Sequence, residues 1–177
     1  MNRFAEMSRL RHIGCTCCLA TQVSSRENSC LWHISACKYL TSTMLDAALS
    51  SYGAQVVLAT SSDENHPPEN IIDGKTETFW ISTGMFPQEF IIRFPDNMKI
   101  FTVSIHSYNI KRLRIEKGTS DDAEKFEAVA DTEFEHTENS LQANDISVNV
   151  LNTTHLRFLI LSGYGPFVSV HKVSVQS

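Results

Sequence analysis

The long C-terminal part of the chain, residues 44–177, contains no cysteine. A domain without cysteine has no disulfide framework, which is typical of proteins in reducing compartments. Glycine is also sparse, and none of the seven glycines belongs to a G-x-x-x-x-G-K phosphate loop, which argues against a P-loop nucleotide site. No apolar run approaches the roughly 18 residues of a membrane helix. The sequence therefore predicts a domain that does not insert into membranes.

The charge of the chain is divided unevenly. Residues 1–43 contain five Lys/Arg and two Asp/Glu, a net charge of +3, whereas residues 44–177 contain ten and eighteen, a net charge of −8, which gives the overall −5. Segments of such different composition are not expected to share a core. We therefore place a domain boundary near Met44, a residue that can itself serve as an alternative start. An acidic domain repels a phosphate backbone, so we expect no nucleic-acid partner.

Residues 1–43 show no useful helical or strand periodicity, and four interpretations of this leader compete. The segment partly matches a secretory signal and partly a mitochondrial presequence. A zinc site is the third interpretation, because two of its cysteines have the C-x-x-C spacing of metal ligands. We favour the fourth, a disordered or alternatively translated extension. The residues that a zinc site would draw on are Cys15, Cys18, Cys30, His33 and Cys37.

From residue 55 onward the chain consists of short apolar runs separated by turn residues, which is typical of an all-β sandwich. Residues 112–117 alternate most clearly, with Leu113 and Ile115 pointing inward. In the same way, residues 100–106 are predicted to place Phe101, Val103 and Ile105 on one face. The fold class that we predict is an eight-stranded jelly roll. The eight predicted strands are 55–60, 89–94, 100–106, 112–117, 126–130, 146–150, 155–161 and 167–175.

The longest connection, residues 61–87, carries the most distinctive polar pattern. Asn70 and Asp73 are three residues apart, a glycine follows at Gly74, and Thr78 precedes Phe79-Trp80. Calcium takes six to eight oxygen ligands, and the side chains of Asn70, Asp73 and Thr78 supply three. With one carboxylate, the predicted site is a structural calcium of modest affinity. The alternative from the residues alone is an Asx-turn in which Asp73 caps its own backbone.

The stretch 68–74, followed by Thr78-Phe79-Trp80, resembles the motif that opens discoidin-type (galactose-binding-like) jelly rolls. In that family the Asn, Asp and Thr positions help to hold a calcium ion, and the resemblance covers residues 46–177. Residues 58–94 and 167–175 further resemble a ciliary subgroup of the family. The subgroup also has a small heat-shock label, but the strand pattern favours the jelly roll, and we do not expect chaperone activity.

The ciliary resemblance implies a non-enzymatic subunit of the intraflagellar transport B complex. Its implied partners are a Rab-like small GTPase, intraflagellar transport protein twenty-seven, and other subunits of that complex. The implied role is export of cargo and signalling receptors from cilia, and the implied location is the cytoplasm and the cilium with its basal body. The histidines are scattered without a nucleophile at suggestive spacing, so we expect no catalysis.

Two other functions stay open. The first is an extracellular discoidin-type module that binds carbohydrate or lipid through a loop tip at Met85 and Phe86; the sequon at Asn152 would then be relevant. The second is a jelly-roll receptor subunit of a ubiquitin ligase, which we rank lower because the chain stops just after its last strand.

For the GTPase interface, the candidates are Tyr108, Arg112 and Arg114, which form a basic-aromatic combination favoured at binding hot spots. The alternative interpretation is that these three are ordinary outward-facing strand residues with no role in binding.

Overall fold

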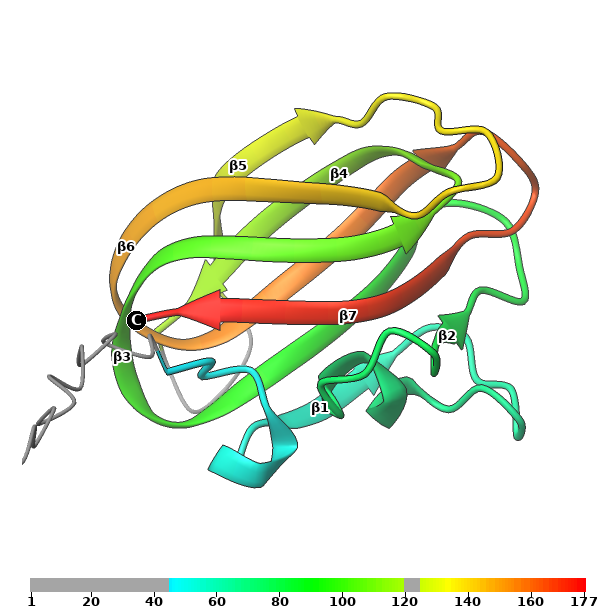
Figure 1. Cartoon of the computed structure of the whole chain (residues 1–177). Coiled ribbons are helices and arrows are strands. Elements are labelled where there is room, and N and C mark those ends of the chain that lie inside the picture. The colour runs from blue at the N-terminus through cyan, green and yellow to red at the C-terminus, as the bar shows by residue number, and fades with distance from the viewer. Residues whose placement is uncertain (1–44, 120–124) are drawn as a thin grey trace, which may run out of the picture. The chain divides into compact units, whose positions relative to one another are not determined.

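The computed structural model describes residues 45–119 and 125–177, and the leader predictions, including the zinc hypothesis, lie outside these residues. The described residues form seven strands and two short 3₁₀ helices (Figure 1). In chain order these are η1 (Ser50–Tyr52), β1 (Gln55–Ala59), η2 (Pro68–Ile72), β2 (Trp80–Ile81), β3 (Gln88–Tyr108), β4 (Ile110–Gly118), β5 (Phe126–Glu133), β6 (Gln142–Gly163) and β7 (Ser169–Gln176). None of the helices in this part of the chain is long and apolar enough to cross a membrane.

The strands form two layers, and β3 and β6 run through both of them. The first half of β3 pairs with β1 and with the second half of β6, which continues to β4 and β5. The second half of β3 lies between β7 and the first half of β6, and β2 pairs with β7. All pairings are antiparallel, and Figure 1 shows β3 and β6 curving from one layer into the other. The predicted all-β jelly-roll sandwich is confirmed, with a five-stranded and a four-stranded layer.

The structure divides the predicted strands differently. The predicted segments 89–94 and 100–106 are two halves of β3, and 146–150 and 155–161 are two halves of β6. Both breaks are bends rather than turns. The β3–β6 register shifts between Arg93 and Met98, and Asn149 and Asn152 take positive φ angles of 46° and 54° in β6. Asparagine tolerates this conformation, so the strand bends without ending. The two-residue strand β2 was not predicted.

The core lies between the two layers. The predicted orientation of one residue, Phe101, is wrong. Ile100, Val103 and Ile105 are fully buried, whereas Phe101 is 37% exposed. The β3–β6 register shifts between Ile100 and Thr102, where two residue steps on β3 lie opposite three on β6, and the alternation breaks there, with Ile100 buried and Phe101 exposed. The alternation that we predicted therefore holds on the C-terminal side of this bulge and fails at Phe101.

A buried aromatic group anchors the long connection to the core. The Trp80 ring is fully buried, lies 5.7 Å from Phe90 in an edge-on arrangement, and donates from Nε1 to the carbonyl oxygen of Ser61 at 2.8 Å. Ile71 and Ile72 of η2 are also buried. Because both ends of the segment 68–80 are fixed in the core, the polar residues between them have a defined position.

Candidate metal site and partner surface

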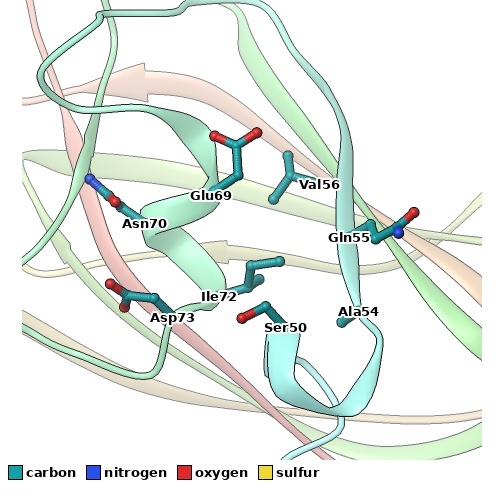
Figure 2. A pocket seen from close by; sticks show the side chains of 8 residues that line it. All are labelled: Ser50, Ala54, Gln55, Val56, Glu69, Asn70, Ile72 and Asp73. Atoms are coloured by element: carbon teal, nitrogen blue, oxygen red, sulfur yellow. The ribbon is translucent and has the colours of Figure 1, made fainter.

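The three predicted calcium ligands lie close together around η2. Asn70 is in η2, Asp73 caps its C-terminal end with φ −82°, and Thr78 follows two residues before β2. A 3₁₀ helix has about three residues per turn, so Asn70 and Asp73 share one side of η2. Figure 2 shows both side chains on the side of η2 that points away from β1.

Each of these side chains forms a hydrogen bond within the loop. The Thr78 hydroxyl donates to Oδ2 of Asp73 at 2.6 Å, and the Lys75 N–H donates to Oδ1 of Asp73 at 2.8 Å. The side-chain amide of Asn70 donates to the carbonyl oxygen of Phe79 at 3.0 Å. The bond from Lys75 closes an Asx-turn, so the structure contains the turn that was the alternative to calcium. The same geometry brings the Asp73 and Thr78 oxygens together.

Gly74 makes the tight turn after η2 possible. Its φ is +82°, and a Cβ atom at this position would lie 2.8 Å from Cδ2 of Leu49. Any other residue here would have a strained backbone and a side chain that clashes with Leu49, so the turn requires glycine.

An aromatic stack holds the outer end of the loop against β7. The rings of His66 and Phe79 stack at 4.0 Å, and those of Phe79 and His171 at 4.9 Å. Nδ1 of His171 also lies 2.8 Å from the carbonyl oxygen of Thr76. This stack was not predicted from the sequence, because His171 is 95 residues away from Thr76.

The donor atoms of the loop fit calcium better than a softer metal. Among the described residues, no group of three or more His, Cys, Asp or Glu side chains could hold a metal ion. The Asp73 carboxylate, the Thr78 hydroxyl and the side-chain oxygen of Asn70 are all oxygen donors, and main-chain carbonyl oxygens would have to complete a shell. Such a mixed oxygen set suits a hard cation such as Ca²⁺ and does not suit Zn²⁺.

The predicted partner residues fall into two places. Arg112 and Arg114 both bind Asp131 of β5, with closest distances of 2.8 and 2.9 Å. Hydrogen bonds from Arg112 and then Arg114 lower the pKa of Asp131 to about 2, and the contact with Asp131 raises the pKa of Arg112. Tyr108 instead ends β3 in the other layer, opposite Ser169. The two arginines thus form one cluster, and Tyr108 is not part of it.

A second charged group on the five-stranded layer was not singled out from the sequence. Arg157 of β6 makes ion pairs with Glu89 of β3 and with Glu116 of β4, the latter at 3.2 Å. Next to this network, Ile91 is only 5% exposed although it does not belong to the core between the layers. The sequence shows the charged residues of β3 and β4 but not their pairing, because Arg157 is 68 residues from Glu89 and 41 residues from Glu116.

Comparison with known proteins agrees with this architecture. Residues 56–173 match the F5/8 type C domain model. The structure is similar to that of CBM32-3 from a family 31 glycoside hydrolase of Clostridium perfringens, with a TM-score of 0.63 and 22% identity over 75% of this chain and 94% of that chain. The chain is therefore an F5/8 type C domain protein.

Similar proteins of known family show to which group of F5/8 type C domain proteins the chain belongs. The chain is 51% identical over 132 residues to the intraflagellar transport protein 25 homolog of Homo sapiens, which covers 75% of this chain and 92% of the relative. It is 40% identical over 132 residues to intraflagellar transport protein 25 of Chlamydomonas reinhardtii, covering 75% of this chain and 69% of the relative. The chain belongs to the intraflagellar transport protein 25 family.

Proposed function

We propose that this chain is a non-enzymatic binding subunit of the intraflagellar transport B complex, and that it acts in the cytoplasm and the cilium. The observation that carries the proposal is the 51% identity to a human intraflagellar transport protein 25 homolog over 92% of its length. In this role the domain binds a Rab-like small GTPase, intraflagellar transport protein twenty-seven, and supports export of cargo and signalling receptors from cilia.

The dispersed positions of the histidines support binding rather than catalysis. His155 is buried in β6, His171 lies in the aromatic stack on β7, and His136 packs edge-on against Tyr164 at 4.8 Å. A general base has to lie within hydrogen-bonding reach of a nucleophile or substrate. Each of these three rings already has a packing role of its own.

The arginine cluster is the surface that we propose for the GTPase. Arg112 is 47% and Arg114 36% exposed in their side chains, and a guanidinium offers several directed donors. Asp131 holds both groups in place, so little side-chain freedom would be lost on binding. Tyr108, opposite Ser169 of β7, lies in the other layer and is not part of this surface.

Calcium is the second part of the proposal. Bound by Asn70, Asp73, Thr78 and main-chain carbonyl oxygens, Ca²⁺ would stabilise the connection between η2 and β2. Such an ion contributes to folding and does not act as a signal, because a site with one carboxylate has modest affinity.

Binding of the purified full chain to the purified Rab-like GTPase tests the partner assignment. We expect one complex by size-exclusion chromatography, and we expect R112E/R114E to weaken it by at least about tenfold. The matched control is R93E, which reverses an exposed arginine of the same layer that bonds to Gln55. No complex at about 10 μM, a concentration at which specific pairs of this kind associate, would contradict the assignment. A complex insensitive to R112E/R114E would move the interface elsewhere.

An extracellular carbohydrate- or lipid-binding module is the second candidate. Met85 is 88% exposed and Phe167 51% exposed. The loops that carry them are joined by the bond from the Val168 N–H to the Ser82 hydroxyl at 3.0 Å. Exposed apolar side chains on two joined loops are of the kind that enters a lipid surface or stacks on a sugar. Binding to galactose or to anionic vesicles that M85A abolishes would favour this candidate.

A further inference from the structure

The side of η2 that faces β1 borders a groove. Two hollows of about 550 and 290 Å³ lie between these elements, and both are lined by Val56 and Glu69. Together their linings include every residue of β1, from Gln55 to Ala59. Figure 2 shows Val56 from β1 and Ile72 from η2 at the space between the two elements. We call this space the β1–η2 groove.

The groove runs along an edge of the five-stranded layer. Within residues 45–119 and 125–177, β1 pairs with one strand, β3, and has no partner on its other side. An edge strand leaves unpaired N–H and C=O groups that can receive another strand. Val57 and Leu58 are 45% and 41% exposed at this edge. The edge therefore offers both backbone hydrogen-bonding groups and apolar side chains.

The wall opposite β1 is held in place by the core. Ile71 and Ile72 of η2 are buried, and Pro67 and Pro68 restrict the chain that leads into it. Ala54, which precedes β1, is only 3% exposed. Because these walls are already ordered, a segment that enters the groove loses its own conformational freedom but demands little from the domain.

The charge of the groove selects the kind of occupant. Glu69 is the charged residue on the groove side of η2; Asp73 borders the larger hollow, but its carboxylate is bonded to the Thr78 hydroxyl and the Lys75 N–H in the polar loop. Among the described residues, no Lys, Arg or His side chain lines either hollow. Glu69 is exposed and takes part in no salt bridge among the described residues. Two copies of this edge would bring like charges together, which disfavours self-pairing. An extended segment that carries Lys or Arg complements the groove in shape and charge.

We propose that the β1–η2 groove binds an extended, basic peptide segment of another protein, which adds to the free edge of β1 as a further strand. Backbone pairing along the five residues of β1 supplies the affinity. A Lys or Arg beside Glu69 supplies selectivity. This inference does not depend on the identity of the GTPase or on the arginine cluster.

Peptide titration of the ¹⁵N-labelled full chain tests the proposal. The probe is an acetylated and amidated heptapeptide, lysine-valine-threonine-valine-threonine-valine-lysine, and its control has glutamate in place of both lysines. We expect saturable shifts and slower amide exchange at residues 55–59 with the lysine peptide. We expect at least about tenfold weaker binding of the glutamate peptide, about the effect of one charge-assisted contact.

Three variants separate edge pairing from non-specific attraction. V57K and L58K place a charge on the edge, a device that blocks strand addition, and each should abolish the shifts at residues 55–59. L151K makes the same change at a residue that is 55% exposed and outside the groove, and it should leave binding unchanged. Absence of saturation up to about 1 mM peptide, the weak limit of specific association, would overturn the proposal. Equal response to the glutamate peptide, or β1 protection that rises with protein concentration alone, would overturn it as well.

Discussion

On one side of η2, the side chains of Asn70 and Asp73 form hydrogen bonds within the segment that leads to β2. On the other side, the same short helix faces the unpaired edge of β1 across the β1–η2 groove. Both sides rest on Ile71 and Ile72, which are buried. One anchored turn therefore carries a closed polar loop in one direction and borders the open edge of β1 in the other.

The largest expected effect comes from removing the anchor that both sides share. W80A should lower the free energy of unfolding by about 3–5 kcal/mol, because it leaves a cavity in the core and an unpaired carbonyl group at Ser61. Urea unfolding at neutral pH measures this loss. F101A is the control, since that ring is 37% exposed, and it should cost about 1 kcal/mol or less. Equal losses in the two variants would show that Trp80 does not anchor η2.

A change at the turn separates the polar side from the groove side. G74A should cost about 1–3 kcal/mol, because alanine is strained at φ +82° and its Cβ atom would meet Leu49. Differential scanning calorimetry measures the change. G165A is the matched control, because a Cβ atom there would meet the flexible amide of Asn109 at 3.3 Å. We expect the loss in G74A to leave peptide binding in the groove intact, so joint loss of both properties would refute the separation of the two sides.

We expect the smallest effect at the exposed cluster of Arg112, Arg114 and Asp131 on β4 and β5, which belongs neither to the polar loop nor to the β1–η2 groove. The pKa of Asp131 is lowered to about 2 in the folded protein, from an ordinary value of 3.8. Its stabilising contribution is therefore present above about pH 4 and is lost as the pH falls through about 2. The difference in unfolding free energy between the natural protein and D131N should shrink between pH 4 and pH 2. If the difference in unfolding free energy stays constant from pH 4 to pH 2, the ion pairs of Asp131 contribute nothing measurable to stability. This is often found for exposed pairs.

Contacts between residues close in sequence were the predictable part of the molecule. The alternation in residues 112–117 correctly placed Leu113 and Ile115 inside. Asp73 and Thr78, which were grouped with Asn70 from the sequence, are joined by a hydrogen bond of 2.6 Å, and calcium binding by the three residues stays a prediction. Both depend on local geometry alone, namely the pleat of a strand and the reach of a short loop. The family resemblance predicted the same fold class independently of either, and the strand pairings and the F5/8 type C match confirm it.

Features that depend on distant pairing were not predictable. The continuity of β3 through its bend, and the outward turn of Phe101, follow from the register with β6, which no local pattern reveals. Arg112 and Arg114 were noticed as exposed cations, but their shared counterion Asp131 is 19 and 17 residues away. The open edge of β1 likewise appears only when the order of strands is known.

The calcium dependence of stability in two matched variants tests most directly whether the two sides of η2 have different tasks. D73N and E69Q each remove one carboxylate, the first from the polar loop and the second from the groove. We expect saturating Ca²⁺, at about 100 times its dissociation constant, to raise the free energy of unfolding of the natural protein and of E69Q by about 2.7 kcal/mol, and to leave D73N unchanged. An equal gain in D73N, or no gain in the natural protein, would contradict the calcium site at the Asn70–Asp73–Thr78 loop.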